Sequence, residues 1–180
     1  MSLTVATLLT ATIFFLLGLA LVVPSTTVVS LFRGFPRSTA ASVVLFSVGT
    51  AGFLYRVVHL SPADFGDYKT YLLVGFSVLA VLSFFCVPDF LAVRGLAVCV
   101  LVGAMPLLDS AFMEYDHPQR LFMVTPIYLI ALPAAIWLGA QPWRMRDFLE
   151  WLFRPGPRAR VFGGMLLAYG VLLGVVAFTY

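Results

Sequence analysis

Two side chains capable of ionic or acid–base chemistry, Arg56 and His59, lie near one end of a long apolar run. They share a helical face with Gly49 and Gly52, and small residues of this kind let a neighbouring helix approach closely. A charge in an apolar run is costly unless it is paired or hydrated. Asp109 is an acid near the end of another apolar run, so the sequence predicts a polar contact between Arg56 and Asp109, with His59 beside it. The alternative is that Arg56 and His59 simply reach the polar surroundings at the end of their run.

A second group of side chains has the chemistry of a divalent-metal site. Asp64 and Asp67 fall in one polar connection, and Glu114, Asp116 and His117 fall in another. Carboxylates and imidazoles are common metal ligands, but no pair here has the spacing of an HxxxH or HxxE site, and a solvated turn is the other interpretation. No histidine lies in the middle of an apolar run, where it could ligate haem or activate a serine. We therefore predict no cofactor, no metal and no enzymatic activity.

Composition defines the elements that position these residues. The chain has 180 residues, of which 62% are hydrophobic and only 11% are charged, whereas a soluble domain carries about 25% charged residues. A surface this apolar needs the bilayer as its solvent. Six apolar runs have about the 20 residues that cross a ~30 Å hydrocarbon core, and they are 3–23, 40–60, 70–87, 90–108, 121–140 and 161–180. The sequence predicts an all-α integral membrane protein with six transmembrane helices in a single transmembrane domain, residues 1–180.

Basic residues are concentrated in the linkers that follow the first, third and fifth runs. Together with Arg94 at the start of the fourth run, these linkers hold eight arginines and three acids, whereas the opposite side, with the ends of its runs, holds three basic residues and five acids. Cytoplasmic segments of membrane proteins carry an excess of lysine and arginine. We therefore expect a protein of the cell (inner) membrane with the three linkers in the cytoplasm and both termini outside.

The three linkers also resemble one another. Each begins with a proline, Pro24, Pro88 or Pro142, and continues through a short apolar-rich segment to arginine and the next run. The similarity predicts three helical hairpins in tandem, and an internal repeat is one explanation of it. The other is that a proline-terminated helix followed by arginine is common at cytoplasmic membrane edges.

The linker between the fifth and sixth runs contains an amphipathic segment, 143–154. As a helix, it places its apolar side chains on one broad arc and most of its charged side chains on the other. This pattern predicts an interfacial helix in the membrane plane, with tryptophans at headgroup depth and arginines towards anionic lipid. The residues expected at the interface are Trp143, Trp151, Arg144, Arg146 and Arg154. Nucleic-acid binding would need a denser basic face, whereas docking against a protein subunit stays open.

The fifth and sixth runs contain residues that shape the backbone. Pro126 and Pro133 lie seven residues apart in the fifth run, where they indicate either a static kink or a hinge beside a substrate path. The sixth run has a face of small residues that predicts close helix packing. Its members are Gly163, Gly170, Gly174 and Ala177.

Two functions fit these features. The glycine face, together with the lack of a mid-membrane acid or a nucleotide motif, favours a structural or accessory subunit of a larger membrane complex. The alternative is a small transporter or channel, and the scarcity of polar residues in mid-run restricts its substrate to a hydrophobic or lipid-like molecule. The expected partners are membrane lipids, and either other membrane protein subunits or further copies of this chain.

Overall fold

The computed structural model describes residues 1–61, 65 and 68–180. Within these residues, six helical segments are long and apolar enough to cross a membrane, which indicates a multi-pass membrane protein. They are α1 (Leu3–Val22), α3 (Thr39–Val58), α5 (Lys69–Cys86), α6 (Leu91–Ser110), the composite segment Pro118–Ala140 and α10 (Arg158–Ala177). Each segment overlaps one predicted apolar run, and no end differs from the prediction by more than three residues.

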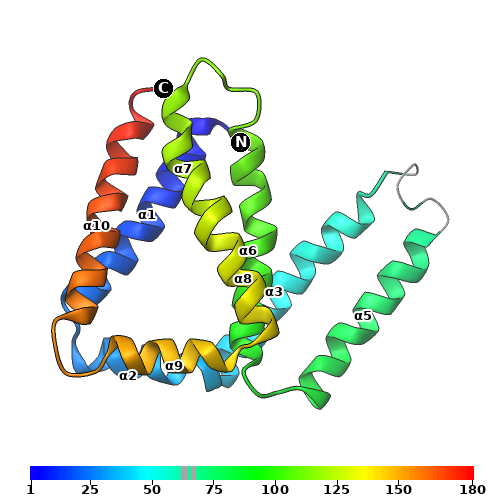
Figure 1. The fold of residues 1–180 in the computed structure, drawn as a ribbon. Helices are drawn as coiled ribbons and strands as arrows, with labels where there is room; N and C mark the ends of the chain where they lie inside the picture. Colours follow the sequence, from blue (N-terminus) through cyan, green and yellow to red (C-terminus); the bar gives the residue numbers. More distant parts are fainter. Residues whose placement is uncertain (62–64, 66–67) are drawn as a thin grey trace.

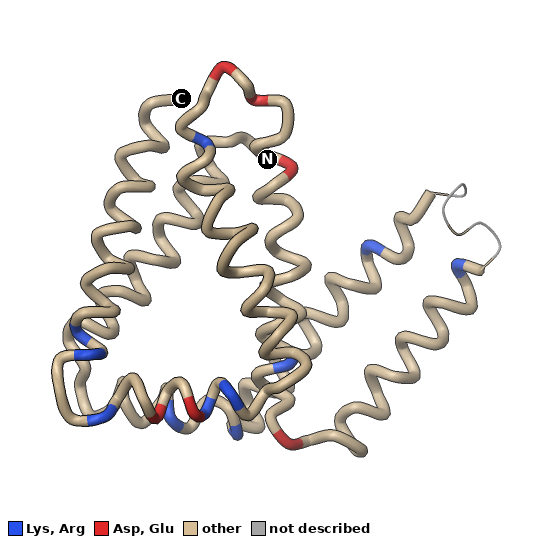
Figure 2. Tube along the Cα trace, viewed as in Figure 1, with Lys and Arg blue, Asp and Glu red and all other residues tan. Residues whose placement is uncertain are grey.

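Short helices connect the long ones at one end of the bundle. They are α2 (Thr26–Gly34), η1 (Phe35–Arg37) and α9 (Trp143–Leu152). In Figure 1, α2 and α9 lie across the ends of the long helices, and both chain termini lie at the opposite end. Figure 2 shows that basic residues gather around α2 and α9. We call the end formed by α2, η1 and α9 the basic end, and the other the terminal end.

Serine side chains begin the first three helices. The hydroxyls of Ser2, Ser25 and Ser38 accept hydrogen bonds from the backbone N–H three residues ahead, at 3.4, 3.2 and 3.2 Å respectively. A helix leaves its first N–H groups without partners, and a serine at the N-cap satisfies one of them. Ser25 therefore starts a new helix directly after Pro24, where the sequence indicated only a short apolar-rich segment.

Glycines set the two closest helix pairs. A Cβ on Gly18 of α1 would lie 2.5 Å from the backbone N of Leu167 in α10, and one on Gly95 of α6 would lie 2.5 Å from the backbone N of Phe46 in α3. Backbones can come this close only where no side chain separates them. As a result α1 packs on α10, α3 packs on α6, and α6 packs on α8. These closest pairs are not the consecutive pairs of three tandem hairpins, which would join α1 to α3, α5 to α6 and α8 to α10.

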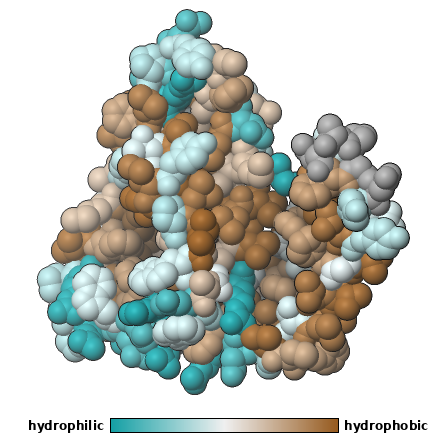
Figure 3. Space-filling model, turned by 45° about the vertical axis from the view of Figure 1, so that its right-hand side comes forward, coloured by the Kyte–Doolittle hydropathy of each residue, from teal (hydrophilic) through white to brown (hydrophobic). Residues whose placement is uncertain are grey.

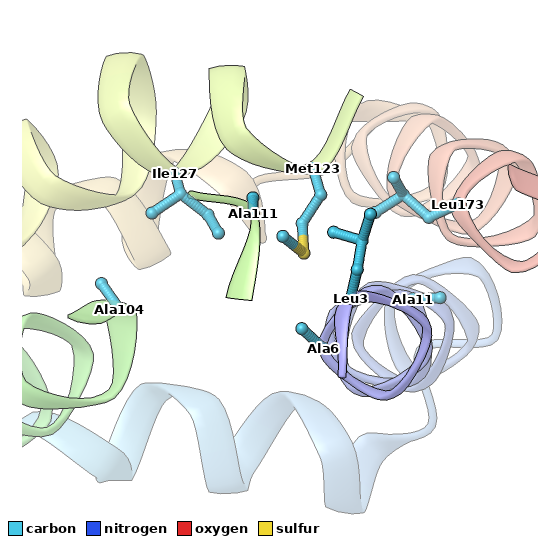
Figure 4. Packing of buried hydrophobic residues seen from close by; sticks show 8 residues of the cluster. All are labelled: Leu3, Ala6, Ala11, Ala104, Ala111, Met123, Ile127 and Leu173. Carbon is cyan, nitrogen blue, oxygen red and sulfur yellow. The ribbon is translucent and has the colours of Figure 1, made fainter. Parts of the chain in front are cut away.

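The main core lies towards the terminal end, where α1, α6, α7 and α10 meet. Its buried side chains, shown in Figure 4, are Leu3, Ala6, Ala11, Ala104, Ala111, Met123, Ile127 and Leu173. The Met123 side chain extends from α7 towards α1, where its sulfur lies 3.5 Å from the Thr7 hydroxyl, and it is fully buried. Four of these residues are alanines, whose small side chains let the helices approach closely.

The fifth spanning segment is not a uniform α-helix. It consists of η3 (Pro118–Arg120), α7 (Leu121–Pro126), the π-helical turn η4 (Ile127–Ala131) and α8 (Leu132–Ala140). The N–H of Leu132 donates to the carbonyl of Ile127, five residues back. Proline has no N–H and its ring crowds the carbonyl four residues back, so Pro133 disfavours the regular α-helical pattern just before it. Pro133 therefore accounts for the π-helical turn between α7 and α8.

Helix α5 stands apart from the rest of the bundle. Its contacts are mainly with α3, and none of its residues is buried. Figure 1 shows α5 and the upper half of α3 extending away from the other helices as a hairpin. We call this hairpin of α3 and α5 the arm.

Candidate functional site

An apolar groove runs between the two helices of the arm and α6. It encloses about 800 Å³, which lies within the range of ligand-binding pockets. Its lining residues come from α3, from the connection that follows it, from α5 and from α6; they are Phe46, Thr50, Phe53, Arg56, Val57, Leu60, Phe65, Leu72, Phe76, Leu79, Ala80, Ser83, Val98, Leu101, Val102 and Met105. Figure 3 shows the mostly apolar surface of this part of the molecule. We call this space the arm groove.

Two aromatic contacts join α5 to α3 across the groove. The rings of Phe46 and Phe84 meet edge to face at 5.3 Å, and those of Phe53 and Phe76 do so at 4.9 Å. Each such pair contributes about 0.5–1.5 kcal/mol beyond the area it buries. Together they contribute about 1–3 kcal/mol, which is little for an 18-residue helix that buries none of its residues. The aromatic pairs thus act as spacers that hold the groove open.

The described lining of the arm groove has few polar groups, and they differ in whether they already have a hydrogen-bond partner. The hydroxyl of Ser83 donates to the carbonyl of Leu79 at 2.7 Å, so its donor is already used. Arg56, in the last turn of α3, is the one charged side chain among the described lining residues. Arg56 is half-buried, and its guanidinium makes no hydrogen bond or ion pair with any residue that the structure describes. The groove therefore presents an apolar channel whose terminal end holds a guanidinium that no described acid neutralises.

The structure does not join Arg56 to Asp109. Asp109 lies next to the last residue of α6 and is exposed, and both ion pairs between described residues belong to Arg146. The reason is the course of α3, which crosses α6 closely near the basic end and leans away from it towards the terminal end. His59, at the C-cap of α3, is exposed; its Nδ1 lies 2.8 Å from the Tyr55 carbonyl, and its ring lies 4.3 Å from the Tyr55 ring.

The acidic residues that the structure describes at the terminal end are not gathered into a metal site. Glu114 and Asp116 are exposed in a turn, and the His117 ring lies against that of Tyr180 at 5.6 Å. Among the described side chains, no group of three histidines, cysteines or acids is close enough together to hold a metal ion. Asp64 and Asp67 lie outside the described residues. The 111–120 turn is instead closed by Arg120, whose Nη1 donates to the Ala111 carbonyl at 2.6 Å.

The small residues of α10 divide into two groups. Gly163, Gly170 and Ala177 are buried against other helices, and a Cβ on Gly170 would lie 2.7 Å from the backbone N of Phe15. Gly174 faces open space, since a Cβ there would meet no atom within 4 Å. The heptad-spaced residues therefore form the face that packs on α1, whereas Gly174 of the GxxxG pair is left outside it.

Helix α9 is packed by two leucines and bordered by aromatic and basic residues. Leu149 and Leu152 are 4% and 2% exposed, and Leu152 joins a cluster with residues of α1 and α10. Trp143 and Trp151 are about half exposed at the rim. Arg158 lies over Trp151, and Arg144 lies over Trp137 of α8. Arg146 pairs with Asp147 at 2.9 Å and with Glu150 at 3.8 Å, and Arg154 is exposed.

The sequence contains a signal for the arm groove that the analysis above does not use. Phe46 and Phe53 lie seven residues apart in one apolar run, and Phe76 and Phe84 lie eight apart in the next, so each pair shares a helical face. Two aromatic faces on consecutive helices favour a wide, ring-spaced contact over a close one. The spacing of these phenylalanines thus indicates an open hairpin.

Comparisons of this chain with protein-family models, with curated proteins and with solved structures found no match. The features that bear on function are therefore the arm, its groove and Arg56.

Proposed function

We propose that this protein is a structural or accessory subunit of a larger membrane complex and that it contacts its partner through the outward side of α5. The observation that carries the proposal is a stripe of exposed apolar residues on the side of α5 opposite the groove. We call it the outer stripe; its members are Tyr71, Val74, Val78, Val81 and Phe85, with exposures of 76, 60, 52, 59 and 78%.

The spacing of the outer stripe is that of a helix-packing seam. Its residues follow one another at intervals of three, four, three and four, which places them along one line of a helix that pairs with another at a small crossing angle. Lipid does not drive apolar helices together, so a membrane helix is held mainly by packing against protein. The other five spanning segments all have buried residues, whereas α5 has none. A partner helix on the outer stripe supplies the packing that this chain does not.

The position of α9 supports a defined orientation in the membrane. Its half-exposed tryptophans and its arginines match the belt where headgroups meet the hydrocarbon core. In the proposed arrangement, α9 lies near the membrane plane on the cytoplasmic side of the inner membrane, and the terminal end with both termini faces outside. The concentration of arginine at the basic end favours this orientation over its inverse.

The test is purification of the full-length protein from its native membrane in mild detergent, followed by native mass spectrometry. We expect a second membrane protein at fixed stoichiometry. Val78→Trp widens the outer stripe and should reduce the co-purified partner by about tenfold, since overpacking an interface costs about 1–3 kcal/mol. Val175→Trp, on α10, is the matched control, because Val175 is 62% exposed and outside the arm.

Two results would contradict this proposal. A chain that runs alone in mild detergent has no subunit role, and a partner retained equally by both tryptophan variants is not bound through the outer stripe. If the purified assembly contains only copies of this chain, the partner on the outer stripe is a second copy of this chain and not a different protein.

A second candidate function, a small transporter for a hydrophobic or lipid-like substrate, is favoured by the arm groove. The groove is apolar, about 800 Å³ in volume, and bordered by a helix held through two ring contacts. Transport would require α5 to move relative to α3. Spin labels on the two arm helices should then report a distance that changes when substrate is added; one fixed distance would exclude this function.

A further inference from the structure

We propose that the arm groove binds one anionic phospholipid, with an acyl chain along the groove and the headgroup phosphate against Arg56. The proposal does not rest on the subunit role, because the groove and the outer stripe occupy opposite sides of α5. It assigns a ligand to the one charged lining residue that has no partner among the described residues.

The charge of the site selects an anion. A guanidinium presents donors in a planar fork that fits phosphate, and such charge-assisted bonds are roughly twice as strong as neutral ones. A half-buried guanidinium among apolar side chains is costly unless an anion or water reaches it. Lys69, the first residue of α5, adds a second cation at the same end of the arm, as Figure 2 shows for the basic positions on the two arm helices. The terminal end of the groove therefore attracts a phosphate.

The length of the groove suits an acyl chain. Its α3 lining extends from Phe46 to Arg56 and its α5 lining from Leu72 to Ser83. At ~1.5 Å per residue, both stretches measure about 15 Å. This is about half of a ~30 Å hydrocarbon core, and so about one leaflet. A lipid whose phosphate lies at Arg56 thus has its chain alongside the groove.

The ring contacts across the groove favour a lipid chain over a partner helix. A helix with side chains is about 10 Å wide. The groove is bridged by the two phenylalanine pairs, whose ring centroids lie 5.3 and 4.9 Å apart. A narrow, flexible chain fits between these rings, whereas a helix would have to separate them. The outer stripe lies on the other side of α5 from these ring contacts, so a partner helix packs there more easily than in the groove.

The test uses the purified full-length protein in detergent, with phosphatidylglycerol and phosphatidylcholine of identical acyl chains as probes. Native mass spectrometry counts the lipids retained per chain. We expect one phosphatidylglycerol, held about tenfold more tightly than phosphatidylcholine, because the choline cation offsets the phosphate charge next to Arg56 and phosphatidylglycerol keeps a net negative charge. Arg56→Gln should abolish this preference. Arg154→Gln, which removes an exposed arginine at the basic end, should leave it unchanged.

A second variant examines the chain-binding part of the site. Ala80→Trp fills the groove without removing apolar surface, and it should lower the retention of both lipids by about tenfold. Val78→Trp, two residues away on the outer stripe, should leave lipid retention unchanged. The crossed pair separates this proposal from the subunit role, because Val78→Trp affects the partner and Ala80→Trp affects the lipid.

Several results would overturn the lipid assignment. Equal retention of the two phospholipids by the unaltered protein would overturn the preference for an anionic lipid, and this comparison needs no variant. Oleate retained in place of phosphatidylglycerol in a competition would show that the groove takes a free fatty acid. Crosslinking from position 80 to a second protein would show that a partner helix occupies the groove.

Discussion

Replacement of Gly170 by alanine tests whether the α1–α10 contact is as close as the structure shows. The new Cβ would lie 2.7 Å from the backbone N of Phe15 and 3.0 Å from the Ala11 carbonyl oxygen. Ordinary contact begins at 3.4 Å, so the two helices must separate by about 0.7 Å at this point. A gap of 0.5–1 Å forfeits a quarter to a half of each dispersion contact around it, and overpacking of this kind costs about 1–3 kcal/mol.

Gly174 provides the matched control, since it lies one helical turn along the same helix. A Cβ there meets nothing within 4 Å, so Gly174→Ala should leave stability unchanged or raise it by up to about 1 kcal/mol through helix propensity. Unfolding in mixed micelles with increasing denaturing detergent, followed by tryptophan fluorescence, gives the difference between the two variants. Equal destabilisation by both substitutions would refute the asymmetric contact and would favour a GxxxG face in which both glycines pack.

Further predictions concern the orientation, the basic end and the terminal turn. With both native cysteines replaced, Thr27→Cys and Ser61→Cys should react with an impermeant thiol reagent from opposite sides of the membrane; reaction from one side would reverse the proposed topology. Leu152→Ala should lower the free energy of unfolding by about 2–5 kcal/mol, because the side chain is 2% exposed; a change below ~0.5 kcal/mol in detergent unfolding would show that α9 is not packed on the bundle. Arg120→Gln should cost about 1–3 kcal/mol, since it removes the 2.6 Å bond that closes the 111–120 turn; an unchanged melting temperature would contradict that role.

The six spanning helices could be predicted because each depends on its own residues alone. Twenty apolar residues in sequence satisfy the length and the backbone requirements of a membrane helix whatever their neighbours do. The same holds for α9, whose predicted segment 143–154 contains the observed helix Trp143–Leu152. Its face is set by the order of its residues, although its packing against α1 and α10 is not.

The arrangement of the helices depends on pairs of residues that are distant in the sequence, and here prediction fell short. The sequence predicts close packing at both Gly170 and Gly174. Only the position of α1 shows that Gly170 packs on it and that Gly174 does not. It likewise places Arg56 and Asp109 at comparable depth, but α3 leans away from α6 beyond their glycine-lined crossing. The arm groove exists because of that divergence. No single helix encodes it, although the phenylalanine spacing on α3 and α5 is consistent with it.

The pairing of α1 with α10 has a consequence for the synthesis of this protein. The glycine side of α1, at Gly18, is made well before its partner residues around Gly163. Until α10 has entered the bilayer, α1 lacks the helix on which it packs most closely, and four other spans are inserted in the meantime. A chain that stops before α10 therefore displays an uncovered glycine surface at Gly18, a feature by which membrane quality control can recognise an incomplete bundle.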